Sequence, residues 1–182
     1  MNSLALALLL GTIASSPFLA FGLANAAPSA TRRQDTVIRR SLIFALCLGL
    51  LTLAGNWAGR VMTGLLEPGQ QWLIDTLWYV VALKMIFVSF RRHPNYVGVD
   101  TGTTGSALLA GIATSTDGLL MALALGLEQQ DAGSFTVYSA GLAFVFVLLG
   151  SGPLASLHAL KRNHPRILLV SGSLLLIITA LT

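Results

Sequence analysis

Charged side chains are scarce in this 182-residue chain: 10% of its residues are Asp, Glu, Lys or Arg, against about 25% in soluble domains. Hydrophobic residues make up 54% of the chain, and the mean hydropathy is +0.77. A surface with so little charge cannot face water over most of its area, which excludes a soluble globular protein. The composition therefore predicts an integral membrane protein in contact with the lipid bilayer.

Cysteine is almost absent, because Cys47 is the only one. A single thiol inside an apolar run excludes a disulfide framework, a redox pair and a cysteine zinc site. The net charge of +4 does not indicate nucleic acid as a partner, because the cations lie in short clusters at the ends of apolar runs. No nucleophile triad, phosphate-binding glycine loop or catalytic carboxylate pair is present, so we expect no enzyme and no resident cofactor, only a transported cation.

Six apolar runs are long enough, or nearly so, to cross a hydrocarbon core, which takes about 20 helical residues. The first run ends at Ala24-Asn25-Ala26, which resembles a signal-peptide cleavage site. It is longer than a signal core and no cation precedes Arg32, so we expect it to remain as a helix. The expected helices cover residues 4–25, 41–64, 71–90, 104–127, 134–157 and 167–182.

Positive charge alternates from one loop to the next. The second and fourth loops, residues 65–70 and 128–133, carry no Lys or Arg. By the positive-inside rule the odd loops face the cytoplasm, and both termini face the periplasm of a bacterial inner membrane. Nine of the eleven cations belong to the odd loops: Arg32, Arg33, Arg39, Arg40, Arg91, Arg92, Lys161, Arg162 and Arg166.

The first and fourth runs share a small, hydroxyl-rich stretch that should loosen a helix at mid-depth. One is Gly11-Thr-Ile-Ala-Ser-Ser-Pro-Phe18 and the other is Gly111-Ile-Ala-Thr-Ser-Thr-Asp-Gly118. Halves of three helices each would insert with opposite orientation, as in transporters whose site lies near the midplane. The alternative is close helix packing by small residues. The predicted fold is an all-α membrane protein of six helices in a 3+3 inverted repeat, residues 1–103 and 104–182.

Asp117 is the leading candidate for a functional residue. It lies near the middle of the fourth run, where a carboxylate costs at least about 2.5 kcal/mol and is usually retained for a function or for an ion pair. Thr114, Ser115 and Thr116 precede it, and their hydroxyls could join it in binding a cation. Gly118 would let the helix open toward a cavity.

Lys84 is the expected partner of Asp117. It lies about six residues from the end of the third run, or about 9 Å inside at 1.5 Å per residue. It could extend to the membrane surface, or pair with Asp117 as a structural bridge or a proton or cation switch. Asn56 could line a pathway or hydrogen-bond a neighbouring helix, and Asp75 is expected to be a solvated interfacial carboxylate.

The stretch Ala113-Thr-Ser-Thr-Asp-Gly118 resembles the fourth-helix segment Ala-Thr-Ser-x-Asp-Ala of bacterial manganese-efflux pumps of the MntP type, in the LysE-like exporter superfamily. The resemblance implies an inner-membrane exporter of a divalent cation such as manganese, with Asp117 as a metal ligand and a basic residue at position 84. Further similar stretches are Leu42-Ile-Phe44, Gly55 to Gly59, Lys84-Met-Ile86 and Phe90-Arg91.

Two acidic positions of that family are not acidic in this chain. The first-helix aspartate falls on Ser16, which Pro17 follows, and the second-helix acidic residue falls near Leu48. The resemblance then implies a midplane site in which Asp117 is joined by neutral oxygens. Those oxygens would come from Ser15, Ser16, Ser115 and Thr116, with Ser15, Asn56 and Thr114 lining the pathway.

Two other functions stay open at this point. One is the export of a small organic solute or amino acid in exchange for protons. The other is a non-transporting membrane subunit of a larger complex, with a homodimer or a partner membrane subunit as its assembly.

Overall fold

The computed structural model describes residues 3–24, 34–65, 70–90, 103–130, 132–151 and 158–181, and these ranges contain helices and turns but no strand. The predicted all-α membrane fold is therefore confirmed. Five helices, α1 to α5, are long and apolar enough to span a bilayer, whereas the apolar part described in α6 is the shorter Arg166–Ile178. The helices are α1 (Ser3–Ala24), α2 (Gln34–Thr63), α3 (Gln70–Phe90), α4 (Thr104–Leu127), α5 (Gly133–Ser151) and α6 (His158–Leu181).

Two helices begin earlier in the sequence than predicted. Helix α2 starts at Gln34 rather than near position 41, and α6 starts at His158 rather than near position 167. The assignment of Arg39 and Arg40 to the first loop is therefore wrong, and so is the assignment of Lys161, Arg162 and Arg166 to the fifth loop. Hydropathy marks only the apolar part of a helix, whereas its backbone hydrogen bonds continue into the polar interface, where Asp35 in the first turn of α2 favours the helix N-terminus.

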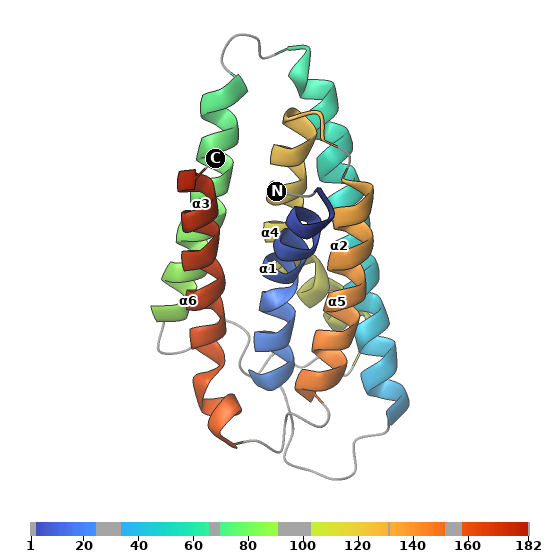
Figure 1. Cartoon of the computed structure of the whole chain (residues 1–182). Coiled ribbons are helices and arrows are strands. Elements are labelled where there is room, and N and C mark those ends of the chain that lie inside the picture. The colour runs from blue at the N-terminus through green and yellow to red at the C-terminus, as the bar shows by residue number, and fades with distance from the viewer. Residues whose placement is uncertain are drawn as a thin grey trace.

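The helices form one bundle in which successive helices run in opposite directions (Figure 1). The start of α1 and the end of α6 therefore lie toward the same end of the bundle. Helices α1 and α4 are antiparallel in this arrangement. The starts of α2, α4 and α6 lie at the other end. Arg39 and Arg40 belong to the first two turns of α2, and Arg166 to the third turn of α6.

The contacts between helices are the same in both halves of the chain: exchanging α1 with α4, α2 with α5 and α3 with α6 leaves the set of contacts unchanged. Helix α1 packs against α5 and α6, and α4 packs against α2 and α3. The remaining contacts, α1 with α4, α2 with α5 and α3 with α6, each map onto themselves. This is the pattern that an inverted repeat predicts. It supports a division into residues 1–103 and 104–182, which we keep as a proposal.

Glycines set the closest helix crossings. A Cβ atom built on Gly59 of α2 would lie 2.3 Å from the Leu123 carbonyl oxygen, and one built on Gly126 of α4 would lie 2.3 Å from the Asn56 carbonyl oxygen. On the other side of the bundle, a Cβ on Gly22 of α1 would lie 3.1 Å from the Gly150 Cα of α5. Without side chains at these points the backbones touch, which fixes α4 against α2.

Candidate cation site on helices α3 and α4

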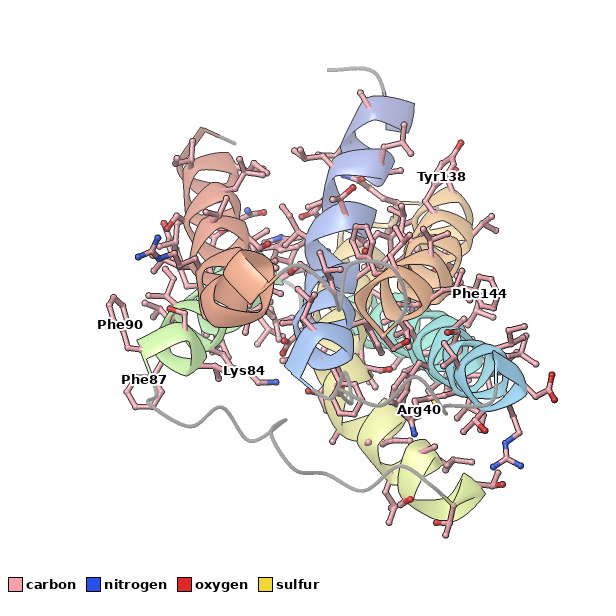
Figure 2. All side chains as sticks on the ribbon, turned by 90° about the horizontal axis from the view of Figure 1, so that it is seen from below. Arg40, Lys84, Phe87, Phe90, Tyr138 and Phe144 are labelled. Atoms are coloured by element: carbon pink, nitrogen blue, oxygen red, sulfur yellow. The ribbon has the colours of Figure 1, made fainter. Side chains whose placement is uncertain are left out.

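Asp117 is the buried acid at the centre of the bundle. It lies about halfway along α4 and is 4% exposed. Its Oδ1 atom is 2.5 Å from the Nζ atom of Lys84, which comes from α3. The structure thus brings together the two residues that the sequence suggested as partners. Figure 2 shows Lys84 extending toward the middle of the bundle, whereas Phe87 and Phe90 of the same helix point outward.

Thr116 completes the contacts of the Lys84 ammonium. The Nζ atom donates to the Thr116 Oγ1 atom at 2.8 Å, and this hydroxyl donates in turn to the Ala113 carbonyl at 3.1 Å. The ammonium therefore contacts two oxygens from adjacent residues of α4. The two charges neutralise each other, but their burial is unequal: the Asp117 side chain is 6% exposed and the Lys84 side chain 41% exposed.

The other predicted hydroxyls are buried and bonded within their own helices. Ser15 donates to the Gly11 carbonyl at 2.7 Å, and Ser115 makes the same bond to the Gly111 carbonyl at 2.7 Å. Thr114 likewise donates to a carbonyl of its own helix. A hydroxyl that donates a hydrogen bond to the backbone still has oxygen lone pairs, which could face a cation.

Helix α1 continues through Pro17 without a break, so the stretch predicted to loosen it remains helical. Proline has no N–H, which deprives the Ile13 carbonyl of its normal helical partner. The Ser16 hydroxyl donates to that carbonyl at 2.8 Å and takes the place of the missing bond. Helix α4 also runs unbroken through Gly118.

Asn56 does not join this group. Its Nδ2 atom donates to the Gln130 carbonyl at 3.4 Å, and Arg60 donates to the same oxygen at 3.2 Å. Both side chains therefore tie α2 to the turn that follows α4. From the sequence, Asn56 is expected either to line a pathway or to hydrogen-bond a neighbouring helix. The contact with Gln130 is a hydrogen bond to the turn after the neighbouring helix α4.

Leu48 of α2 packs against Gly118, the residue that follows the central acid. Its Cδ1 atom would lie 2.4 Å from a Cβ built on Gly118, the residue after Asp117. This apolar side chain belongs to the stretch of α2 on which the resemblance places the family's second-helix acidic residue. Among the described residues, no group of three or more His, Cys, Asp or Glu side chains could hold a metal ion. A cation at Asp117 would therefore depend on neutral oxygens for its other ligands.

A second polar feature, absent from the sequence-based candidates, lies at the end of the bundle that carries the chain termini. It is a cavity of about 290 Å³ between α1, α3, α6 and the end of α4. Glu128 on its wall accepts hydrogen bonds from Trp78 Nε1 at 3.4 Å and from Gln130 Nε2 at 2.7 Å. Asp75, predicted to be solvated, is exposed and accepts a hydrogen bond from Gln71 at 3.2 Å.

The environment of Glu128 raises its pKa. Partial burial of the carboxyl group is the main cause, although the residue as a whole remains exposed. The hydrogen bond from Trp78 lowers the pKa, and the charge of Asp75 raises it further. In the sequence Glu128 directly follows an apolar run, which is typical of a solvated residue at a helix end. Its place on the cavity wall depends on α1, α3 and α6, which no local pattern indicates.

Comparisons with known proteins identify the family of the chain. The sequence model of the family Mntp, described as "Putative manganese efflux pump", matches residues 31–181. A relative in Desulfosudis oleivorans (strain DSM 6200 / JCM 39069 / Hxd3), named "Putative manganese efflux pump MntP", is 29% identical over 107 residues. That match covers 59% of this chain and 57% of the relative's length. No solved structure matches the chain.

Proposed function

Since the chain belongs to the manganese-efflux-pump family Mntp, we propose that it exports a divalent cation such as manganese from the cytoplasm through a site at Asp117. The observation that carries this proposal is a buried carboxylate halfway along a membrane helix, held by a cation from the neighbouring helix. An acid at that depth is costly and is retained where ions or protons cross. Transport rather than enzyme chemistry is the activity that such a site supports.

The proposed ligands are hard oxygens. Asp117 supplies the carboxylate, Thr116 the nearest hydroxyl, and Ser115 and Ser16 further buried hydroxyls. Carboxylate and hydroxyl oxygens suit manganese or magnesium better than the softer transition metals, which prefer sulfur and imidazole. A midplane site on α1 and α4 requires Ser16 to approach Asp117 during transport.

The orientation is part of the same proposal. The basic ends of α2 and α6 would face the cytoplasm of a bacterial inner membrane, and both termini the periplasm. The cation would then enter from the basic end of the bundle, meet Asp117 at mid-depth, and leave toward the cavity that contains Glu128 and Asp75.

A second candidate is favoured by Leu48. An apolar side chain beside Gly118 leaves Asp117 without a second nearby carboxylate from α2, which weakens a divalent site. A neutral Lys84–Asp117 pair is also suited to proton exchange, so export of a small organic solute is the alternative. A non-transporting subunit, in a homodimer or with a partner membrane protein, would need neither cation nor proton at Asp117.

Manganese accumulation in cells separates these functions. In cells without a manganese exporter of their own, the wild-type protein should lower cellular manganese and restore growth at high manganese. Asp117→Asn should abolish both effects at normal membrane abundance. The matched control is Asp35→Asn, which makes the same change at an exposed acid in the first turn of α2 and should export normally. Unchanged cellular manganese with abundant wild-type protein would refute manganese export, and normal export by Asp117→Asn would refute this site.

A further inference from the structure

We infer that the Lys84 ammonium is a tethered cation that occupies the oxygens of the site when no transported ion is bound, and that a divalent cation must displace it. This inference rests on the proposed function and deepens it. It assigns Lys84 a role in the affinity and the release of the transported ion, beyond that of a structural partner of Asp117.

The contacts of Lys84 are those that a transported cation would need. Its Nζ atom lies 2.5 Å from Asp117 Oδ1 and 2.8 Å from Thr116 Oγ1. A small divalent cation binds such oxygens at about 2.0 to 2.6 Å. The ammonium and the metal cannot share these two oxygens, since their positions would overlap and their charges repel at this distance. Binding of one therefore requires departure of the other.

Unequal burial decides which partner moves. The Asp117 side chain is 6% exposed and is fixed on α4 between Thr116 and Gly118, whereas the Lys84 side chain is 41% exposed. Lysine carries its charge on a flexible four-carbon chain with three donors. Helix α3 ends at Phe90, about 9 Å farther along the helix at 1.5 Å per residue. The ammonium can therefore withdraw toward the interface while the carboxylate stays in place.

Displacement favours ions of higher charge. A monovalent cation that replaces the ammonium exchanges one unit charge for another at Asp117, whereas a divalent cation adds a second unit of attraction. The competition thus selects divalent over monovalent cations without a second carboxylate. This accounts for how a site with one central acid could serve a divalent substrate.

The tethered ammonium also gives the site a neutral resting state. After the metal leaves, Lys84 returns to Asp117, so the empty protein does not keep an unpaired carboxylate in its core. The same competition lowers the affinity for the metal and promotes its release. Removal of the ammonium should therefore tighten metal binding and slow export.

Direct binding of Mn²⁺ to the purified protein in lipid nanodiscs tests this inference, with free Mn²⁺ followed by its electron paramagnetic resonance signal. Lys84→Met should bind Mn²⁺ at least tenfold more tightly than the wild type. Lys84→Arg retains the competing charge and should stay within about threefold of the wild type. Arg39→Met removes one exposed cation at a helix start and should not change the affinity.

The outcomes distinguish this inference from the proposed function. Asp117→Asn should remove the bound Mn²⁺, both alone and combined with Lys84→Met. If neither the wild type nor Lys84→Met binds more Mn²⁺ than Asp117→Asn, the proposed function fails. If the wild type binds Mn²⁺ through Asp117 but Lys84→Met binds it no more tightly, the function stands and the tethered-cation role is refuted. An equal gain in Lys84→Arg would also refute it, because the ammonium charge would not be the cause.

Discussion

The side chain of Leu48 on α2 lies directly against Gly118 on α4, one residue after the acid at the centre of the bundle. An acidic side chain at position 48 would therefore enter the surroundings of Asp117. Two carboxylates bind a divalent cation more strongly than one, but they repel each other when the site is empty. The apolar residue at this position thus limits the charge of the site.

Leu48→Asp should make the protein's stability depend on manganese. Without metal it should lower the melting temperature, because it removes a buried apolar side chain and adds a like charge. Added Mn²⁺ should raise the melting temperature of Leu48→Asp more than that of the wild type. Leu48→Asn is the matched control, since it changes the shape equally without a charge. An equal response to Mn²⁺ in both variants would show that position 48 does not reach the site.

Loss of Lys84 and loss of Asp117 should lower the stability of the protein by different amounts. Lys84→Met leaves a carboxylate in the core, whereas Asp117→Asn leaves an ammonium that can extend to water. Loss of one member of a buried pair costs on the order of 3 to 5 kcal/mol, and the exposure of Lys84 should place Asp117→Asn below that range. Thermal unfolding in detergent should therefore rank Lys84→Met as the less stable single variant.

The double variant separates a structural role from transport. Lys84→Met with Asp117→Asn leaves no lone charge, so its membrane abundance should match that of the wild type. If Asp117 carries the ion, this abundant protein should still fail to lower cellular manganese. Wild-type export by the double variant would mean that the pair has only a structural role.

The crossing of α2 and α4 should not tolerate a methyl group. Gly126→Ala would place a Cβ 2.3 Å from the Asn56 carbonyl oxygen, and the rigid backbone on both sides cannot move aside locally. The helices would separate, at a cost of about 1 to 3 kcal/mol for an overpacked core. Gly141→Ala is the control, since a Cβ there meets nothing within 4 Å. Unfolding in detergent should show a loss for Gly126→Ala and none for Gly141→Ala.

Glu128 should make stability depend on pH. Its pKa lies above the ordinary value of 4.5, chiefly because of partial burial, so between the two pKa values the folded protein holds a proton that the unfolded chain has released. This contribution to stability is full below pH 4.5 and is lost as the pH rises through the raised pKa. Glu128→Gln keeps an acceptor for Trp78 but does not titrate. Its melting temperature should therefore fall less than that of the wild type over this range; equal falls would exclude Glu128 as the source.

Local patterns in the sequence are sufficient to locate the helices but not to predict which helices pack against each other. The apolar runs located all six helices, and the start of α2 was placed too late because Asp35 and Arg39 are polar yet helical. Lys84 could be matched with Asp117 because few charges lie deep in the spans. The contact of Leu48 with Gly118 could not be foreseen, because it depends on how two helices distant in the sequence cross.

The helix contacts have a consequence for biosynthesis. Among the described residues, every pair of helices in extensive contact joins one helix of α1 to α3 with one of α4 to α6. As the chain emerges from the ribosome, the first three helices enter the bilayer before the helices that they pack against exist. Gly55 and Gly59 must face lipid until α4 is inserted, and Gly22 until α5 is inserted. The native bundle can therefore assemble only after α6, whose described apolar part is shorter than a full span, has been inserted.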